Sequence, residues 1–472
     1  MLKLSALCLA SLLLLQAAGG AAAQPGAPAP ASNAAGDQAI AERIDSLVAP
    51  LFKAGEPGAS IIVTRDGRPV YRKAFGMADM ASGQVMTPGT SLRLGSITKQ
   101  ITATAILMLA EEGKLAVGDD ITTFLPDYPT RGKRITIEHL LTHTSGIVSY
   151  TGKSGFEATM NRDLSVAQML STFKDDPLDF EPGTRHRYNN SGYFLLGAII
   201  EKVSGLSYAK FVEQRIFVPL GMRQSAYEGH ERGTGPRAAG HTTKDGGFGP
   251  SAPLSMALPY AAGSLVSSVD DLALWDAAIV SGKLLKPASY RQAFTAYTLA
   301  DGKRTGYGYG WAIGKLRGLP MAAHGGAING FSTFALRLPG QKLYVAVLTN
   351  ADAGLPSAET IALKAAAIAV GDPFPERKAI KLDPALLAAY EGSYRIDDQS
   401  QRTFRSVNGQ LVMERNGRGK TVIPAFSDNG FFIEDSTTYL EFQRDVKGAV
   451  SQVTVYGTGE PAVNVRVGTR QP

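Results

Sequence analysis

The sequence predicts an α/β domain followed by a small all-β domain. Strand-like segments lie near both ends of the first 370 residues, whereas residues 100–290 between them have mainly helical patterns. Beyond about residue 390, short strands alternate with turn signals. We therefore expect an antiparallel sheet built from both ends of the main domain and flanked by helices, with a helical subdomain inserted. A small antiparallel barrel or sandwich should follow it.

The first residues have the pattern of a secretory signal peptide. Lys3 precedes an apolar stretch that runs to Leu15, and small residues end at Ala23. The segment is too short to span a membrane. We expect residues 1–23 to be removed on export, so that the protein is periplasmic or secreted in a bacterium. Residues 24–37, rich in Ala, Pro and Gly, should form a disordered leader.

Composition argues against several classes of function. The only cysteine, Cys8, lies in the signal segment, so the mature chain has no thiol for redox chemistry or for a metal site. His139 and His143 have a metal-like spacing, but Leu140 replaces the Glu that the His-Glu-x-x-His pattern needs. The net charge of +6 is small for 472 residues and no basic run occurs, which argues against nucleic acid. We expect no metal and no cofactor.

The main domain is expected over residues 38–374. Apolar residues at helical spacing predict a helix near residues 40–51. Two strands around a central turn are expected between residues 59 and 78, and two more between residues 331 and 349. A helix should follow over residues 357–370. The two ends of the domain thus supply strands and covering helices, and a site is expected at the seam with the helical subdomain.

The C-terminal antiparallel β domain is expected over residues 383–472, after a Gly- and Pro-containing boundary near residues 371–384. Four turn signals, each a residue followed by Gly, divide it into short strands: Asn408, Asn416, Asn429 and Lys447. The domain could either close over a site in the main domain and restrict substrate size, or stabilise the chain.

The stretch around Ser96 is the first candidate for chemistry. Ser96 follows a Gly and opens a long apolar helix, and Lys99 lies three residues on, one turn along the same face. A Ser hydroxyl becomes nucleophilic when a base takes its proton, and a Lys can be that base when burial lowers its pKa. The same Ser-x-x-Lys pattern begins at Ser171 and Ser207, on ordinary amphipathic helices. Taken alone, it is more often a helix N-cap than a catalytic pair.

A second constellation is Tyr188 and Asn190, ahead of another helical run. A Tyr beside a Lys can act as a phenolate or as a proton shuttle, and an Asn two residues later can bond both the Lys and a substrate carbonyl. The alternative interpretation is a core Tyr and a helix-capping Asn.

A third constellation directly precedes the second pair of strands and consists of His324, Gly325, Gly326 and Ala327. Adjacent glycines allow another molecule to approach the backbone, and an edge-strand N–H that points into a cleft can serve as half of an oxyanion hole.

In this order, the three constellations resemble those of the serine hydrolases of the class C β-lactamase, penicillin-binding protein and D-aminopeptidase group. The resemblance covers about residues 40–370 and implies the β-lactamase-like fold. Further matching stretches are 135–146 (Ile-Thr-Ile-Glu-His-Leu-Leu-Thr-His-Thr-Ser-Gly), 181–183 (Glu-Pro-Gly), 219–222 (Pro-Leu-Gly-Met) and 262–265 (Ala-Gly-Ser-Leu).

The resemblance also implies a role for each residue. Ser96 would be the acylated nucleophile, Lys99 its base, and Tyr188 a second proton carrier that assists deacylation. Asn190 would position the substrate and Lys99. The backbone N–H groups of Ser96 and Ala327 would form the oxyanion hole.

One departure from the family pattern bears on the substrate. His324 stands where β-lactamases and most penicillin-binding proteins have the Lys of Lys-Thr-Gly. A largely neutral His should weaken recognition of a substrate carboxylate, and family members with His-x-Gly resemble D-aminopeptidases and esterases. We predict an acyl-enzyme hydrolase of amide or peptide bonds in small substrates, including D-residue peptides such as those of the cell wall. A carboxylesterase, a weak β-lactamase and a non-catalytic binding or scaffold protein are the alternatives, and the sequence leaves the oligomeric state open.

Overall fold

The computed structural model describes residues 34–230, 235–397, 400–457 and 465–470. The expected signal peptide lies outside the described residues, as does most of the expected leader. Helix α1 (Ala34–Val48) begins within the last residues of that expected leader. In the described part of the chain, no helix has the length and apolar character needed to cross a membrane.

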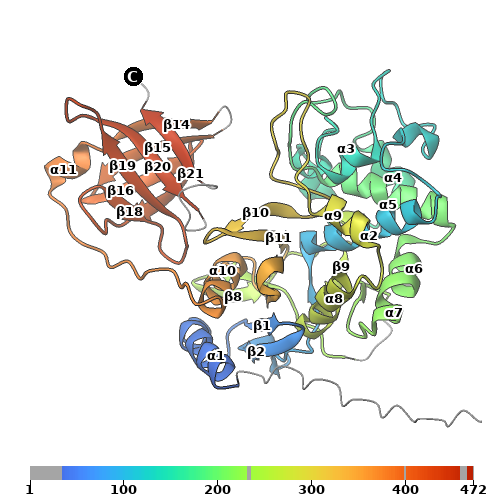
Figure 1. Ribbon diagram of the computed structural model, residues 1–472, viewed down its shortest axis with the longest axis horizontal. Coiled ribbons are helices and arrows are strands. Elements are labelled where there is room, and N and C mark those ends of the chain that lie inside the picture. The colour runs from blue at the N-terminus through green and yellow to red at the C-terminus, as the bar shows by residue number, and fades with distance from the viewer. Residues whose placement is uncertain (1–33, 231–234, 398–399, 458–464, 471–472) are drawn as a thin grey trace, which may run out of the picture.

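A six-stranded antiparallel sheet forms the centre of the main domain (Figure 1). In spatial order its strands are β10 (Ala312–Leu316), β11 (Leu319–Ile328), β12 (Phe331–Leu338), β13 (Leu343–Thr349), β1 (Ala59–Arg65) and β2 (Arg68–Phe75). β1 pairs with β13, so strands from the two ends of the domain meet inside the sheet. The expectation of a sheet built from both ends is confirmed.

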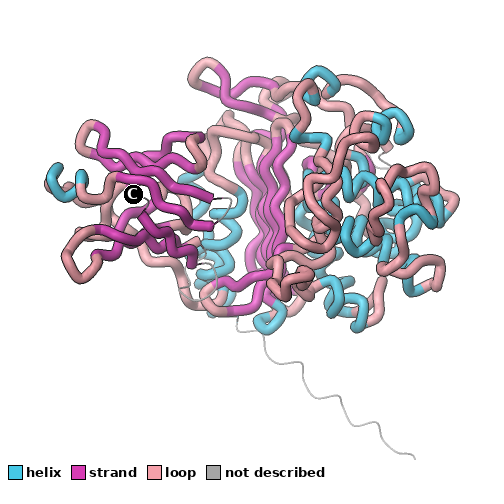
Figure 2. The backbone as a smooth tube through the Cα atoms, turned by 90° about the horizontal axis from the view of Figure 1, so that it is seen from above, coloured by secondary structure: helices cyan, strands magenta, loops and turns pink. Residues whose placement is uncertain are grey.

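Helices cover both faces of this sheet, which Figure 2 shows edge-on. α1 and α10 (Ala358–Ala369) share one hydrophobic core with Ile61 and Val63 of β1. Ile62, between them in sequence, belongs to the core on the other face. Side chains alternate across a strand, so a strand covered on both faces is apolar at successive positions.

The helical subdomain packs against the second face. Its helices are α2 (Thr98–Glu111), α3 (Ile137–Leu141), α4 (Val166–Ser171), α5 (Asn190–Ser204), α6 (Tyr208–Val212), α7 (Val218–Leu220), α8 (Val269–Ser281) and α9 (Pro287–Ala293). α2 is buried from Thr98 to Leu109. A helix surrounded on every side is apolar all round, which accounts for the long apolar run after Ser96.

Short strands complete the main domain. β5 (Leu92–Arg93), β9 (Leu265–Ser267) and β6 (Ala226–Tyr227) form a three-stranded sheet in that order, and the two remaining pairs are β3 (Met77–Asp79) with β4 (Gln84–Val85) and β7 (His241–Lys244) with β8 (Gly247–Pro250). β5 leads directly into the turn that carries Ser96.

The C-terminal part is an eight-stranded antiparallel sheet that follows the short helix α11 (Pro384–Ala388). Its strands are β14 (Gly392–Asp397), β15 (Ser400–Val407), β16 (Gln410–Arg415), β17 (Arg418–Ile423), β18 (Gly430–Phe432), β19 (Tyr439–Arg444), β20 (Val450–Tyr456) and β21 (Val465–Arg470). They pair in the order β17-β16-β15-β14-β21-β20-β19-β18. The all-β prediction is confirmed, but strand pairing is open, since β17 and β18 are the two ends of this order.

The turn signals account for three of these connections. Asn408 and Asn416 have φ of 51° and 52° and are each followed by a Gly with positive φ, the backbone that a tight hairpin turn requires. Lys447 lies in the turn between β19 and β20. Asn429 instead precedes β18 and joins no directly paired strands, so that signal marks a strand start.

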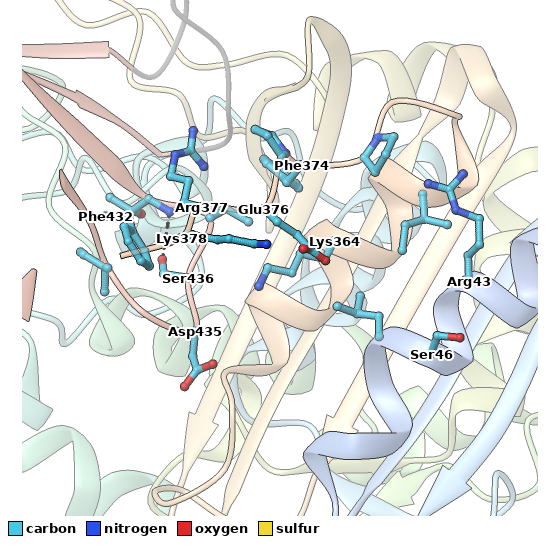
Figure 3. Close-up of a pocket in the computed structure, with 17 residues that line it drawn as sticks. Arg43, Ser46, Lys364, Phe374, Glu376, Arg377, Lys378, Phe432, Asp435 and Ser436 are labelled. Carbon is cyan, nitrogen blue, oxygen red and sulfur yellow. Dashed lines mark hydrogen bonds between the residues drawn. The ribbon is translucent and has the colours of Figure 1, made fainter. Parts of the chain in front are cut away.

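The C-terminal sheet lies on the α10 side of the main domain. In Figure 2 it stands beyond the helices that cover the first face, away from the helical subdomain. A cleft of about 710 Å³ separates it from the main domain (Figure 3), lined by Arg43 of α1, Lys364 of α10, and Phe432 and Asp435 of the β domain.

Gly326 brings β11 into backbone contact with the segment that precedes α2. A Cβ atom at Gly326 would lie 2.0 Å from the carbonyl oxygen of Leu94 and 2.3 Å from Oγ1 of Thr333. No side chain fits there unless the strand moves away from the Leu94 backbone. The second Gly of the pair before Ala327 is therefore required by packing.

We expect Gly326→Ala to lower the free energy of unfolding by about 1–3 kcal/mol or more, because the added methyl meets backbone on a strand fixed on its other side by β12. Thermal and urea unfolding measure this. Gly340→Ala is the matched control, since a Cβ there would have no neighbour within 4 Å. Equal stability of the two variants would contradict the close approach.

Candidate active site

The turn that carries Ser96 is a single 3₁₀ turn, η2 (Gly95–Ile97), between β5 and α2. Gly95 has a φ of 52°, in the left-handed region that favours glycine. A Cβ atom on Gly95 would lie 3.2 Å from the backbone nitrogen of Ala327. The turn therefore holds Ser96 directly beside β11, at the seam between the sheet and the helical subdomain.

Lys99 lies in the first turn of α2 and is fully buried. Its Nζ has three neighbours, each at 2.9 Å: Oγ of Ser96, Oδ1 of Asn190 and the carbonyl oxygen of Ala262. The amide and carbonyl oxygens can only accept hydrogen bonds. A neutral Lys99 would give its two hydrogens to them and direct its lone pair at the Ser96 hydroxyl, the one neighbour able to donate.

Electrostatics favour that neutral form. Burial holds the pKa of Lys99 well below its ordinary value, and no carboxylate pairs with it among the described residues. The rings of Tyr188 and Tyr193, at 4.9 and 5.5 Å from Nζ, favour the ammonium. Such contacts contribute about 1–2 kcal/mol, whereas complete burial of an unpaired charge costs more. Burial therefore decides the direction.

Asn190 is the first residue of α5. Its Oδ1 accepts from Lys99, and its Nδ2 donates to Oγ1 of Thr151 at 3.2 Å. An amide NH₂ has two hydrogens, so one remains for a substrate. The helix itself is capped by Asn189, whose side chain accepts from the backbone N–H of Gly192. The two neighbouring asparagines thus divide capping and site positioning between them.

Tyr188 lies in the loop before α5, with its ring near Lys99. Although 41% of the residue is exposed, protein surrounds its hydroxyl, and this burial raises the pKa above its ordinary value. A hydrogen bond with Ser96 acts in the opposite direction and is the smaller effect. The phenol therefore stays protonated near neutral pH, which favours a proton shuttle over a phenolate.

His324 is buried on β11 and is neutral. Its Nδ1 lies 2.6 Å from the carbonyl oxygen of Gly325, so Nδ1 carries the proton. Its Nε2 then accepts from the hydroxyl of Tyr307 at 2.8 Å. Burial and the nearby Lys99 lower the pKa of His324 to about 3. No positive charge stands where the Lys-Thr-Gly enzymes have their Lys.

The edge of β11 that borders Ser96 is open. β10 pairs with β11 only as far as Ala323, so the outer edge from His324 to Ile328 has no strand partner in the described part of the chain. Ala327 is exposed, and its nitrogen is close to Gly95. The backbone nitrogen of Ala327 therefore lies beside the turn that carries Ser96.

The sequence interpretation missed His143 as a positioning residue. Its ring lies 4.3 Å from that of Tyr188 and 4.7 Å from that of Tyr307, and its Nδ1 accepts from the N–H of Asn189 at 3.1 Å. His143 has a φ of 59°, uncommon for a residue other than Gly. The Thr-His-Thr-Ser-Gly stretch that contains His143 was visible in the sequence, but the placement of its side chain was needed to show that it contacts Tyr188.

The metal-like spacing of His139 and His143 has a structural explanation. Nδ1 of His139 accepts from the N–H of Thr136 in a capping box, and α3 ends before His143. Within the described residues, no group of three or more His, Cys, Asp or Glu side chains is placed to hold a metal ion.

A pocket of about 150 Å³ opens at Ser96 and is also lined by Asn190, Gly263 and Ala327. The cleft next to the C-terminal sheet is larger, but Ser96, Lys99, Tyr188 and Asn190 are absent from its lining. The volume of a cavity therefore does not identify the candidate active site, whereas the hydrogen bond between Ser96 and Lys99 does. No residue of the C-terminal sheet lines the pocket at Ser96, so the described arrangement does not support gating by that sheet.

Asn190→Asp tests the charge state of Lys99. If Lys99 must be neutral, kcat/KM should rise with pH through its lowered pKa, and a carboxylate beside Nζ should raise that pKa by about 1–3 units. The acid limb of the pH profile should move to higher pH by the same amount, with activity recovering in alkali.

Asn190→Ala is the control for loss of the amide. It should lower the rate without moving the limb upward, because it adds no charge. His324→Asn should leave the limb in place, since His324 is already neutral. An unmoved limb in Asn190→Asp would contradict the assignment of Lys99.

Comparisons with known proteins agree with this geometry. A sequence model of the family described as Beta-lactamase matches residues 37–370. Penicillin-binding protein 4* of Bacillus subtilis (strain 168) is 28% identical over 459 residues, which cover 90% of this chain and 99% of that protein.

Two solved structures are similar over long stretches. The octameric penicillin-binding protein homologue from Pyrococcus abyssi has a TM-score of 0.63 and 26% identity, with 93% of this chain and 100% of that chain covered. The D-stereospecific amidohydrolase from Streptomyces sp. has a TM-score of 0.54 and 28% identity, with 68% and 95% covered.

Proposed function

The chain belongs to the Beta-lactamase family of serine hydrolases, and from that premise we propose that it hydrolyses amide and ester bonds of small substrates through an acyl-enzyme on Ser96. The observation that carries the proposal is the buried Lys99: of its three hydrogen-bond partners among the described residues, the Ser96 hydroxyl is the one able to donate. A nucleophile and a base in contact are what this chemistry requires.

In the proposed first step, Ser96 Oγ attacks the substrate carbonyl carbon while its proton passes to Lys99 Nζ. The negative charge that develops on the carbonyl oxygen is held by the N–H groups of Ser96 and Ala327. The C–N or C–O bond then breaks, and the leaving group takes a proton from Tyr188, which Lys99 replenishes. Asn190 keeps Lys99 oriented and offers its free N–H to the substrate.

In the second step, a water molecule attacks the acyl carbon and gives its proton to the Tyr188 and Lys99 pair. The bond to Ser96 Oγ breaks, the hydroxyl is reprotonated, and the acid leaves. Tyr188 acts here as a neutral shuttle, because its raised pKa disfavours a free phenolate.

Small amides, including D-residue peptides, are the first proposed substrates, supported by the 28% identity to a D-stereospecific amidohydrolase. Carboxylic esters are the second, supported by the absence of positive charge on His324, which removes a carboxylate anchor. The same absence argues against an efficient β-lactamase. A scaffold role would leave the hydrogen-bonded set of Ser96, Lys99 and Asn190 without a use.

We also propose two domains, residues 38–374 and 383–472, joined by the segment between α10 and α11. The second has its own core, to which Tyr390, Tyr394, Phe404 and Phe442 belong. Its distance from the pocket at Ser96 favours a stabilising role over control of substrate access.

Ser96→Ala should lower kcat/KM on the order of 10⁴-fold or more, because a nucleophile and its base act together and removal of either one abolishes most of the rate. A fluorophosphonate should add covalently to the wild-type protein, with mass spectrometry placing the adduct on Ser96. Hydrolysis of a nitrophenyl ester and an N-acetyl-D-alanyl anilide measures turnover.

Ser171→Ala is the matched control, since Ser171 has the same Ser-x-x-Lys spacing but is exposed at the end of α4. It should retain full activity and labelling. A folded wild-type protein that forms no adduct would contradict the acyl-enzyme and favour the scaffold alternative.

We propose further that the protein is exported from a bacterial cell, supported by the signal-peptide pattern that ends at Ala23. Expression with the native N-terminus should give a periplasmic or secreted product whose first residue is Gln24, as N-terminal sequencing would show. Ala21→Glu and Ala23→Glu together should block processing, because cleavage needs small residues there. A cytoplasmic product that keeps Met1 would contradict export.

A further inference from the structure

The pocket that opens at Ser96 is uncharged. Among the described residues that line it, none is Asp, Glu, Lys or Arg. Its apolar walls include Phe156, Met160, Leu254 and Ile328, and its side-chain amides are Asn190 and Asn329. The volume is about 150 Å³, and a cavity of that size can hold a benzene ring.

The walls are joined to one another by hydrogen bonds. The carbonyl oxygen of Met160 accepts from the N–H of Ser255 at 2.7 Å. Nδ2 of Asn329 donates to the carbonyl oxygen of Ala252 at 3.1 Å. Segments that come from the helical subdomain and from the end of β11 therefore hold one another, and the pocket is formed before a substrate binds.

The groups behind the pocket supply no charge for an ionic substrate either. Lys99 is occupied by three protein partners, and both nitrogens of His324 are engaged. The N-terminus of α5 could attract an anion, but two of its first amides already have partners. Asn190 N–H donates to Oγ of Ser149, and Gly192 N–H donates to Asn189.

Resting on the proposed acyl-enzyme function, we infer that the acyl group of the substrate is uncharged, largely apolar and about the size of a benzene ring. The acyl group stays on Ser96 Oγ through both steps while the leaving group departs after the first, so the pocket that contains Ser96 is assigned to the acyl group. The substrate class is esters or amides of small neutral acids, including N-blocked amino acids. Acyl groups with a free ammonium or carboxylate are excluded.

The expected discrimination follows from desolvation. A charged acyl group that enters this pocket leaves water without gaining a counter-charge. Because the pocket is still open at one end, we expect this desolvation to lower kcat/KM on the order of 10- to 100-fold.

Four nitrophenyl esters of nearly equal shape test the inference: 4-methylpentanoyl, D-leucyl, L-leucyl and succinyl. The leucyl esters add an ammonium, and the succinyl ester replaces the terminal isopropyl group with a carboxylate. Rates are corrected with Ser96→Ala, which removes background hydrolysis. The neutral ester should have the highest kcat/KM, by at least about 10-fold over each charged ester.

Charge variants at Asn329 should move that preference predictably. Asn329→Lys should raise kcat/KM for the succinyl ester relative to the neutral ester by about 10-fold or more, and Asn329→Asp should do the same for the leucyl esters. Asn329→Gln is the uncharged control and should keep the wild-type order. Thermal unfolding checks that each variant folds.

The outcomes separate the inference from the proposed function. Ser96-dependent turnover with a leucyl or succinyl ester equal to or faster than the neutral ester overturns the uncharged acyl pocket alone. A fluorophosphonate adduct on Ser96 without turnover of the neutral ester also overturns the uncharged acyl pocket alone. Absence of both adduct and turnover overturns the acyl-enzyme and the inference together.

Discussion

A buried lysine without a counter-charge is the constraint on which the rest of this structure depends. Lys99 is completely enclosed and surrounded by acceptors and a hydroxyl in place of a carboxylate. An ammonium in that position would be costly, so the protein lowers the pKa and obtains a base. The apolar character of α2 and the packing of the helical subdomain around it are what maintain this burial.

The same burial requires that the site be assembled from distant segments. Ser96 and Lys99 come from the turn before α2, Asn190 from the start of α5, Ala262 from the stretch before β9, and the open backbone edge from β11. Gly95 and Gly326 let two of these backbones touch. A seam between a rigid sheet and a packed helical region fixes all of them at once, and little side-chain freedom is lost when a substrate binds.

Neutrality extends beyond Lys99 to the whole site. Burial keeps His324 neutral, and Tyr188 remains a phenol. Proton transfer can therefore occur among groups that carry no permanent charge, with charge appearing only as the reaction proceeds. An enclosed, preorganised set of donors stabilises such developing charge more strongly than water does. The C-terminal sheet stands apart from this arrangement, on the other side of α10.

The sequence by itself determined which elements form and which residue types could react. Strand-like apolar runs and turn residues predicted β1, β2, β12 and β13, and two Asn-Gly signals predicted the hairpins that join β15, β16 and β17, because these depend on local backbone preferences. The spacing of Ser96 and Lys99 follows from one helical turn. Tertiary structure alone decided that Lys99 lacks a carboxylate, that His143 supports Tyr188, and that the pocket at Ser96 is uncharged. Those properties arise from contacts between residues far apart in the chain, and neither spacing nor composition specifies them.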